Sequence, residues 1–311
     1  MDLFANIPGK EKFNNPVVTI GSFDGIHLGH KKIINKLLEK ANERKGDSIV
    51  LTFETHPRTF LNPEIALKII TSNQEKEDRL KKEGVDYILL LQFSREMADL
   101  NAMDFYNQLL INKLGVKDII IGYDHTFGKN REGGIELLRE LENRTGLGVY
   151  QVSEELVDGR AISSTWIRHE ITIGNVAKAK ELLGWEYDIT GYVVRGEGRG
   201  STLLGYPTAN VQPNNESKIV PADGAYAVTV NIEGFPEKKG MLNIGTNPTF
   251  DGKKRTIEAN IFDFDADLYG KEITVCFHER IRGEQKFGNF EELKKQLNED
   301  KRKAAEILVG I

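Results

Sequence analysis

The sequence has little cysteine and no long apolar run. Its 311 residues include one cysteine, Cys276, so no disulfide can form within the chain, and such low cysteine usage is typical of a reducing compartment. No apolar run approaches the roughly 18 residues that cross a membrane, and the first residues lack the apolar segment of a signal peptide. These absences predict a cytoplasmic protein without a membrane partner, in which Cys276 is a core residue.

The excess of charge is also small. The chain has 42 lysines and arginines against 47 aspartates and glutamates, which argues against broad nucleic-acid binding but leaves room for local anion sites. The sequence contains no internal repeat or low-complexity tract. With 39% apolar and 29% charged residues, a chain of this length is expected to be globular and to build two cores.

A glycine-rich run, GSFDGIHLGH at residues 21–30, follows an apolar stretch at 17–20 and precedes a helical pattern that begins near Lys31. This order predicts a strand, a turn and a helix start. At such a start the unpaired backbone N–H groups and the positive end of the helix dipole favour an anion such as phosphate. Gly25 and Gly29 would let the phosphate approach the backbone closely.

His27 and His30 stand three residues apart in this run, so on a helical turn they project toward the same place. Nucleotidyl transfer needs donors aimed at phosphate oxygens more than it needs covalent help, and imidazoles can supply them. Two alternatives stay open. The run can be a loop with two exposed histidines and no ligand, or, with less support, a zinc site, for which no third ligand lies nearby and H-E-x-x-H is absent.

Apolar runs alternate with helical patterns through the first half of the chain. Such alternation predicts a parallel sheet covered by helices on both faces, as in a Rossmann-like α/β domain. The predicted strands are 17–20, 48–53, 87–91, 119–121 and 149–152, and the predicted later helices are 74–83, 102–113 and 135–145.

Ligands of such sheets bind beyond the carboxyl ends of the strands, where this sequence carries polar residues. Polar segments follow three of the strands, at 54–58, 122–131 and 162–168, and we expect them to converge on one crevice. The last segment holds three hydroxyl residues and an arginine, which are Ser163, Ser164, Thr165 and Arg168. The hydroxyls either cap a helix or, together with the arginine, bind a phosphate group.

Near residue 185 the pattern changes to short alternating strands separated by glycines, which predicts two domains, 1–184 and 185–311. The second domain is predicted to be an antiparallel β-barrel or sandwich that ends in a helix. Its predicted strands are 187–195, 224–232, 239–244, 255–261 and 272–282, and its helix is 290–309.

A second glycine-rich run, GEGRG at 196–200, is followed by LGYPTAN at 204–210, and neither is the Walker pattern. In an extended segment Thr208 and Asn210 share a face, so their oxygens either ligate a magnesium ion or simply satisfy a turn begun by proline. Glu258 lies on a predicted strand, where it is either a charge at the rim or a general base for a substrate hydroxyl.

Taken together, these motifs resemble the bacterial bifunctional riboflavin kinase/FMN adenylyltransferase (FAD synthetase) family, and the resemblance covers about residues 17–303. In the first half the motifs are GSFDGIHLGH at 21–30, His56-Pro57, 122–128 and ISSTWIR at 162–168. In the second half they are GYPTAN at 205–210, 221–226, 244–250, 263–270, Arg282 and Lys286-Phe287.

The resemblance implies two reactions, each of which uses ATP and magnesium. The barrel would phosphorylate riboflavin to FMN and leave ADP, and the α/β domain would join AMP from a second ATP to FMN, giving FAD and pyrophosphate. By the resemblance His27, His30 and Glu258 are catalytic, and Thr208 and Asn210 hold the metal. The residues implied for ATP and phosphate are Gly21, Phe23, Asp24, Gly25, Gly29, Ser163, Ser164, Thr165, Arg168, Gly196, Gly198, Gly205, Pro207, Thr208 and Asn210. Those implied for the flavin are His56, Pro57, Asp124, Asn247, Phe250 and Arg282.

The sequence departs from the family pattern in three places. Thr55 stands where many members have proline, Asp124-His125 replaces a more usual Asn/Asp-Phe pair, and the loop at 200–205 is one residue longer than usual. Two other functions stay open: adenylyl transfer to another acceptor such as pantetheine phosphate, and flavin binding without catalysis. The oligomeric state is also open, and weak self-association is compatible with the sequence.

Overall fold

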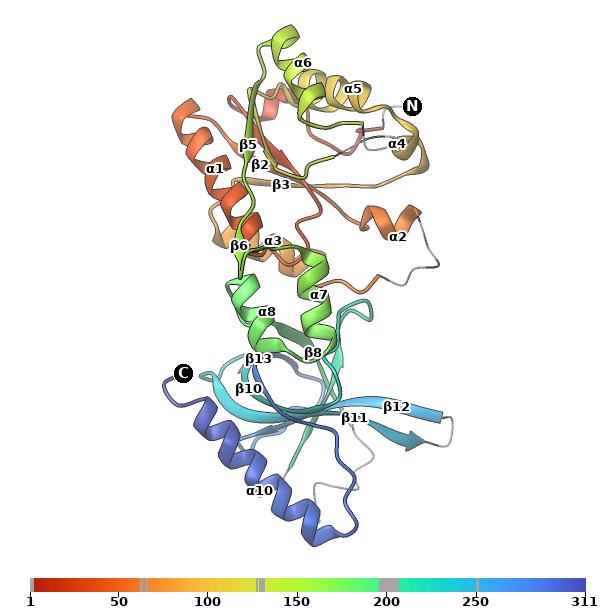
Figure 1. Ribbon diagram of the computed structural model, residues 1–311, viewed down its shortest axis with the longest axis vertical. Helices are drawn as coiled ribbons and strands as arrows, with labels where there is room; N and C mark the ends of the chain where they lie inside the picture. Colours follow the sequence, from red (N-terminus) through yellow and green to blue (C-terminus); the bar gives the residue numbers. More distant parts are fainter. Residues whose placement is uncertain are drawn as a thin grey trace. The chain divides into compact units, whose positions relative to one another are not determined.

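The computed structural model describes residues 3–61, 64, 67–126, 128, 132–195, 207–249 and 252–311, with the backbone alone at 247–249 and 252–254 (Figure 1). The chain forms two compact units. The first consists of Met1–Leu67 and Thr71–Ser164, and the second of Lys68–Ile70 and Thr165–Ile311.

The first unit is built on the predicted parallel sheet, which the structure confirms. Its five strands run in the order β3-β2-β1-β4-β5, and every neighbouring pair is parallel. The strands are β1 (Val17–Ile20), β2 (Ser48–Phe53), β3 (Tyr87–Leu91), β4 (Asp118–Gly122) and β5 (Gly148–Val152). Because the chain continues from β1 to one side and returns at β4 on the other, the order reverses between these two strands, which is where ligands of such sheets bind.

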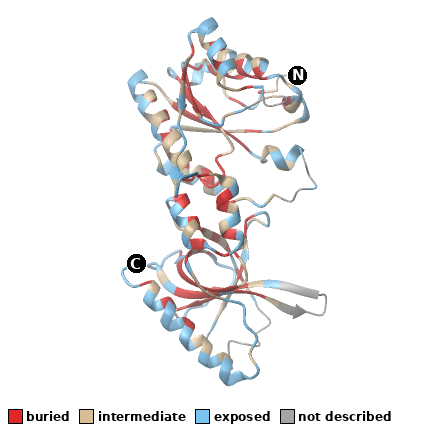
Figure 2. Cartoon of the chain, in the orientation of Figure 1, coloured by how far each residue is buried: buried red, intermediate tan, exposed pale blue. Residues whose placement is uncertain are grey.

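Alternate residues of the strands face two separate cores. Val18 and Ile119 pack into one core, while their neighbours Val17 and Ile120 pack into the other. Figure 2 shows the central strands β1, β2 and β4 as largely buried and the outer faces of the helices as exposed. One core is completed by α1 (Leu28–Arg44) and α3 (Asn73–Lys82). The other is completed by α4 (Arg95–Asp99), α5 (Ala102–Phe105), the π-helix η2 (Tyr106–Leu114) and α6 (Ile135–Thr145).

Shorter elements connect these parts of the first unit. They are η1 (Lys10–Lys12), α2 (Pro57–Leu61), and the strand pair β6 (Leu156–Val157) and β7 (Arg160–Ala161).

The second unit is a closed antiparallel barrel, so the barrel and not the sandwich is confirmed. Its strand order is β10-β11-β12-β9-β8-β13. The strands are β8 (Asp188–Val194), β9 (Ala209–Pro213), β10 (Gly224–Ile232), β11 (Lys238–Thr249), β12 (Gly252–Ile261) and β13 (Glu272–Gly283). The helices of this unit are α7 (Ser164–Thr172), α8 (Val176–Leu183) and α10 (Phe290–Ile307).

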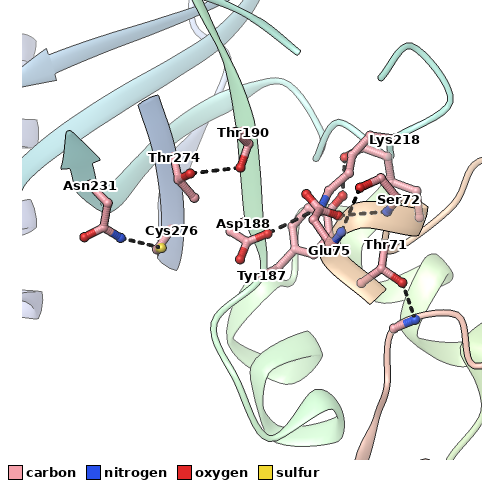
Figure 3. Close-up of polar contacts among 12 residues, drawn as sticks. Thr71, Ser72, Glu75, Tyr187, Asp188, Thr190, Lys218, Asn231, Thr274 and Cys276 are labelled. Atoms are coloured by element: carbon pink, nitrogen blue, oxygen red, sulfur yellow. Dashed lines mark hydrogen bonds and ion pairs between the residues drawn. The ribbon is translucent and has the colours of Figure 1, made fainter. Parts of the chain in front are cut away.

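Helix α10 covers part of the outer face of the barrel. Ala304 and Leu308, at its end, form a buried cluster with Ala227 of β10 and Met241 of β11. On β13, burial raises the pKa of the Cys276 thiol to about 12, and Asn231 donates a hydrogen bond to its sulfur (3.7 Å, Figure 3). Cys276 is therefore a poor nucleophile, as predicted. It is only partly buried, however, because it alternates with the buried residues Val275 and Phe277, so its predicted place in the core is wrong.

A short piece of chain from between α2 and α3 belongs to the second unit. The N–H of Ile69 donates to the carbonyl of Ser217 (2.8 Å), and the N–H of Ile219 donates to the carbonyl of Ile69 (3.1 Å). The ammonium of Lys68 donates to the carbonyl of Glu216 (2.7 Å). These bonds add residues 68–70 to the barrel unit as a short parallel bridge.

An ion pair between a half-exposed arginine and a buried aspartate joins helix and sheet in the first unit. The Arg44 guanidinium donates to both carboxylate oxygens of Asp118 (Nε to Oδ2 2.6 Å, Nη2 to Oδ1 2.7 Å), and the Asp118 side chain is fully buried. A paired, doubly hydrogen-bonded carboxylate is tolerated in a core, whereas an unpaired one is not.

We predict that Arg44→Met lowers the free energy of unfolding of the first unit by about 3 kcal/mol, because it leaves the Asp118 charge buried without a partner. Urea unfolding followed by circular dichroism measures the loss. Both tryptophans, Trp166 and Trp185, lie in the second unit, so their fluorescence transition should stay unchanged. The control Arg139→Met, which removes an exposed pair with Glu142, should cost less than about 1 kcal/mol. An equal effect of both variants would contradict the prediction.

Candidate functional site

The loop between β1 and α1 has an unusual backbone. Phe23, Gly25 and Ile26 have φ angles of +46°, +89° and +37°, in the left-handed region that residues with a β-carbon rarely adopt. Phe23 and Ile26 are each 1% exposed and pack in the core beneath α1. Burial of these two side chains thus holds the loop in a conformation that its sequence would not favour by itself.

The structure brings the two histidines of this loop together. Helix α1 begins at Leu28, three residues earlier than predicted, with His27 as its N-cap. The N–H of His30 donates to Nδ1 of His27 (3.3 Å), and the two imidazoles stack with centroids 3.7 Å apart. Because Nδ1 of His27 accepts, we infer that its proton is on Nε2, which makes that nitrogen a donor. The first turn of α1 carries no acidic residue to oppose an anion there.

Asp24 lies inside the protein, 3% exposed. Its Oδ1 accepts hydrogen bonds from the N–H (3.0 Å) and the hydroxyl (3.3 Å) of Thr71. The N–H of Gly25 donates in turn to Oγ1 of Thr71 (2.9 Å, Figure 3). The Asp24 carboxylate therefore anchors the loop to the segment before α3, and its side chain faces Thr71.

The hydroxyl segment at 163–165 contacts this loop through Ser164. Ser164, the first residue of α7, donates from its hydroxyl to the carbonyl of Asp24 (2.9 Å), and Ser163 precedes it in the chain. Thr165 and Arg168 lie further along α7, in the second unit. Nε of Arg168 donates to the carbonyl of Lys68 (3.0 Å).

A cavity of about 310 Å³ opens beside the loop, at the carboxyl ends of β1 and β2. Gly21, His56 and Pro57, all predicted site residues, are part of its lining, whereas Asp124 is exposed and lies outside it. The other lining residues are Ile20, Ser22, Phe53, Arg58, Leu61, Phe93, Met97, Ala98, His125, Thr126 and Gly128.

The walls of this cavity are largely aromatic and aliphatic. The Phe93 ring meets those of Phe53 and Phe60 edge to face, with centroids 5.7 and 5.4 Å apart. An apolar space with a few polar groups suits a planar heteroaromatic ligand. Phe93 and Met97 could not be recognised as lining residues from the sequence, because they come from around α4, which is too short to show a clear helical period.

His125 lines the cavity, and its hydrogen bonds determine which ring nitrogen carries the proton. Its Nε2 lies 3.0 Å from the hydroxyl of Tyr106, and that hydroxyl also lies 3.0 Å from the carbonyl of Gly133. A carbonyl only accepts, so we infer that Tyr106 donates to Gly133 and that Nε2–H of His125 donates to Tyr106. Burial lowers the pKa of His125 to about 4, so the ring is neutral at pH 7 and its Nδ1 is an acceptor.

A second polar constellation lies on the barrel of the second unit. Asn210 of β9 is the direct cross-strand partner of Glu258 on β12, which puts their side chains on one face, about 5 Å apart at Cβ. Thr208 precedes β9 by one residue and shares that face with Asn210. Ile257 and Ala259, on either side of Glu258, are buried, so this face is the outer one.

Two hydrogen bonds order this face. Thr256 donates from its hydroxyl to Oε1 of Glu258 (3.0 Å), and Asn260 donates from Nδ2 to the carbonyl of Pro207 (2.7 Å). The first leaves the carboxylate as an acceptor that is held in place, and the second ties the start of the GYPTAN motif to β12. A positioned carboxylate beside hydroxyl and amide oxygens can take up a proton and can face a hard cation.

Arg282, a predicted flavin residue, is held by helix α10. Its guanidinium donates from Nε and Nη2 to Oδ2 of Asp300 (2.9 and 2.8 Å), and Asp300 is 1% exposed. It also lies over the Phe287 ring, 5.7 Å from the centroid. The predicted residues Gly196, Gly198, Gly205 and Phe250 and the side chain of Asn247 fall outside the described residues.

The residues that the structure describes contain no cluster of three or more His, Cys, Asp and Glu side chains able to hold a metal ion. Thr208 and Asn210 would instead offer neutral oxygen ligands, a hydroxyl oxygen and an amide oxygen.

Among the residues that the structure describes, no helix is both long and apolar enough to span a membrane.

Comparison with known proteins places both units in one family. The family described as FAD synthetase matches residues 9–166, and the family described as riboflavin kinase matches residues 183–308. The curated bifunctional riboflavin kinase/FMN adenylyltransferase of Escherichia coli (strain K12) is 37% identical over 290 residues, 93% of this chain and 92% of that one. The chain belongs to the bifunctional riboflavin kinase/FMN adenylyltransferase family. Its activities are accordingly the phosphorylation of riboflavin to FMN and the adenylylation of FMN to FAD, both at the expense of ATP.

Other proteins are similar to this chain over nearly its whole length. The protein of this name from Bacillus subtilis (strain 168) is 36% identical over 300 residues, 95% of this chain and 93% of that one. A crystal structure titled as a macrolide-efflux protein from Streptococcus pneumoniae matches with a TM-score of 0.85 and 36% identity, covering 94% of this chain and 96% of that one. The predicted fold class, an α/β domain followed by a β-barrel with a terminal helix, is thereby confirmed for the bifunctional enzyme.

The low pKa of His125 predicts a change of stability with pH. Between the usual histidine value near 6.5 and about 4, the unfolded chain binds a proton that the folded one does not, so stability is lost as the pH falls through this window. His125→Phe should reduce the fall in the free energy of unfolding between pH 7 and pH 4.5, by up to about 1.4 kcal/mol per pH unit. Urea titrations at several pH values measure it. His169→Phe, at an exposed histidine, is the control, and the same slope in His125→Phe and wild type would contradict the prediction.

Proposed function

We propose that adenylyl transfer takes place at the loop of His27 and His30, and that phosphoryl transfer takes place on the barrel face of Glu258. The observation that carries this proposal is that each unit has its own constellation of polar groups, one at the start of α1 and one across β9 and β12. Every residue assigned to either reaction comes from a single chain, so the proposal does not require self-association.

In the first reaction the triphosphate of ATP lies at the start of α1. Backbone N–H groups there, with Nε2–H of His27 and the His30 ring, offer donors to the phosphate oxygens. An oxygen of the FMN phosphate attacks the α-phosphorus, the bond to the bridging oxygen breaks, and pyrophosphate leaves with the electron pair. Gly21, Phe23, Gly25 and Gly29 shape this loop, and Ser163 and Ser164, which belong to the same unit, complete the nucleotide site.

The flavin ring of FMN occupies the cavity of about 310 Å³. What supports this is the shape and chemistry of its lining: Phe53, Phe93 and Pro57 offer flat apolar contacts, and His56 and His125 offer polar ones. The cavity begins at Gly21, so a ligand within it reaches the loop that holds the triphosphate. Asp124, which is exposed, would contact the flavin from outside this lining.

In the second reaction Glu258 acts as general base. Its carboxylate takes the proton of the terminal ribityl hydroxyl while that oxygen attacks the γ-phosphorus of ATP, and ADP leaves. Thr208 and Asn210 would hold Mg²⁺ with their side-chain oxygens, and the ion would neutralise charge on the phosphates when bound. The support is the register of β9 and β12, which sets Asn210 beside Glu258.

We further propose that the two catalytic modules divide near residue 184 and that the enzyme works in the cytoplasm. The riboflavin kinase match begins at residue 183, which supports the boundary. A single cysteine with a thiol pKa of about 12 fits a reducing compartment, where ATP is also available.

Separate sites predict separable losses. Glu258→Ala should lower FMN formation from riboflavin by at least about 100-fold, the usual contribution of a general base, and leave FAD formation from supplied FMN intact. His30→Ala should do the opposite. Purified variants are incubated with riboflavin or FMN, ATP and magnesium, and the flavins are separated by chromatography. Glu279→Ala and His169→Ala, at exposed positions, are matched controls. Equal loss of both steps in either catalytic variant would overturn the assignment.

Filling the cavity should affect adenylylation alone. Ala98 lines the cavity, so Ala98→Trp is expected to raise the KM for FMN in FAD formation roughly tenfold or more, the effect of blocking about one ring of contact. Riboflavin phosphorylation in the same sample should be unchanged. Ala5→Trp, at an exposed position of the first unit, controls for the added ring. A normal KM for FMN in Ala98→Trp would place the flavin elsewhere.

A further inference from the structure

His125 is fixed in the wall of the cavity at both its backbone and its ring. Its N–H donates to the carbonyl of Gly122 (3.2 Å), in the turn that follows β4. Its Nε2 lies 3.0 Å from the hydroxyl of Tyr106, which donates to the carbonyl of Gly133 (3.0 Å). Tyr106, on the π-helix η2, is fully buried, and Gly133 is buried as well. The ring of His125 is therefore attached to the interior of the first unit.

These hydrogen bonds also give the free nitrogen of the ring a direction. The two nitrogens of an imidazole point away from each other, so with Nε2 turned toward the buried Tyr106, Nδ1 of His125 is directed away from the core. Nδ1 makes no hydrogen bond to any residue that the structure describes. Because Nε2 carries the proton and burial lowers the pKa of His125 to about 4, Nδ1 keeps its lone pair at pH 7.

Other polar side chains of the lining do not impose such a choice on a ligand. The lining residues that the structure describes include no Asp, Glu, Asn or Gln. The hydroxyls of Ser22 and Thr126 can donate as well as accept, so they tolerate either kind of group. Nδ1 of His125 can only accept, so the edge of a ligand that lies against it must present a hydrogen-bond donor.

The ring system of oxidised FMN has a single group of this kind. Its imide nitrogen N3 carries a hydrogen, whereas the other free ring nitrogens and both carbonyl oxygens are acceptors. An N–H that leaves water for an apolar cavity costs free energy unless an acceptor replaces the water. The fixed acceptor of the cavity and the single N–H of the ring therefore complement each other.

We propose that Nδ1 of His125 accepts a hydrogen bond from N3–H of FMN, which makes His125 a specificity-determining residue for adenylyl transfer and sets the pyrimidine end of the flavin against it. This inference rests on the proposed binding of FMN in the cavity. Phenylalanine, which is more usual at this position in the family, offers no acceptor. The contact would therefore distinguish this chain from relatives that carry phenylalanine.

The test compares FMN with 3-methyl-FMN, in which a methyl group replaces the N3 hydrogen. Wild-type enzyme should prefer FMN in FAD formation by roughly tenfold or more in kcat/KM, because the analogue leaves the acceptor without a donor. His125→Phe should lower this preference to within about threefold. Since the phenylalanine ring is larger than imidazole, a lower preference cannot come from extra room for the methyl group.

Controls act on the ligand and on the protein. Riboflavin and 3-methylriboflavin are compared in the phosphorylation step, where His125→Phe should leave the preference unchanged, because that reaction is proposed to take place in the second unit. His169→Phe, at an exposed histidine, should keep the preference of wild type for FMN in FAD formation. If His125→Phe does not fold, His125→Leu, which also lacks an acceptor, takes its place.

Two results would overturn the proposal: equal use of FMN and 3-methyl-FMN by wild type, or the same preference for FMN in wild type and His125→Phe. Failure of the underlying flavin assignment gives a different result. In that case Ala98→Trp would leave the KM for FMN normal, and the proposal for His125 would fall with the assignment. A raised KM in Ala98→Trp together with an unchanged preference in His125→Phe would refute the role of His125 alone.

Discussion

The first unit depends on a strand that is buried on both faces. All four residues of β1 are at most 5% exposed, so this strand and its neighbours have no room for a catalytic group along their length. Polar side chains that bind a ligand can therefore lie only beyond the end of the strand. The chain makes that transition within a few residues, from Ile20 to His27, and Phe23 and Ile26 turn back into the core on the way. The loop at which we propose adenylyl transfer is thus held by the burial of two apolar side chains.

The barrel of the second unit leaves polar side chains accessible in another way. An antiparallel strand can bury one face and leave the other accessible, so β12 buries Ile257 and Ala259 in the barrel while Glu258 faces outward between them. Here the proposed site residues lie within strands and are aligned by the strand register, as Asn210 and Glu258 are. The two proposed sites therefore differ in kind: one lies at the end of a strand and the other on the face of a strand.

The sequence predicted most of this fold because its elements carry strong periodic patterns. The bounds 17–20, 48–53 and 87–91 were predicted correctly, since these runs are apolar and end sharply at polar residues or turns. The start of α1 was predicted three residues late, because histidine is not a usual N-cap residue and gives no capping signal. His56 and Pro57, which line the cavity, were predicted from a motif. The burial of Lys76 was not predicted, because on a helix rich in charged residues nothing in the sequence distinguishes the lysine that tertiary packing buries.

Residues 68–70 belong to the second unit although the chain on both sides of them belongs to the first. They are encoded between helices of the first unit, yet their backbone bonds complete the edge formed by Ser217 and Ile219 in the second. A fragment that begins near residue 184 would lack this tripeptide, so the carbonyl of Ser217 and the N–H of Ile219 would lose these backbone partners. The two units are therefore interleaved in the sequence, and an excised kinase half would have to carry residues 68–70 with it to keep these bonds.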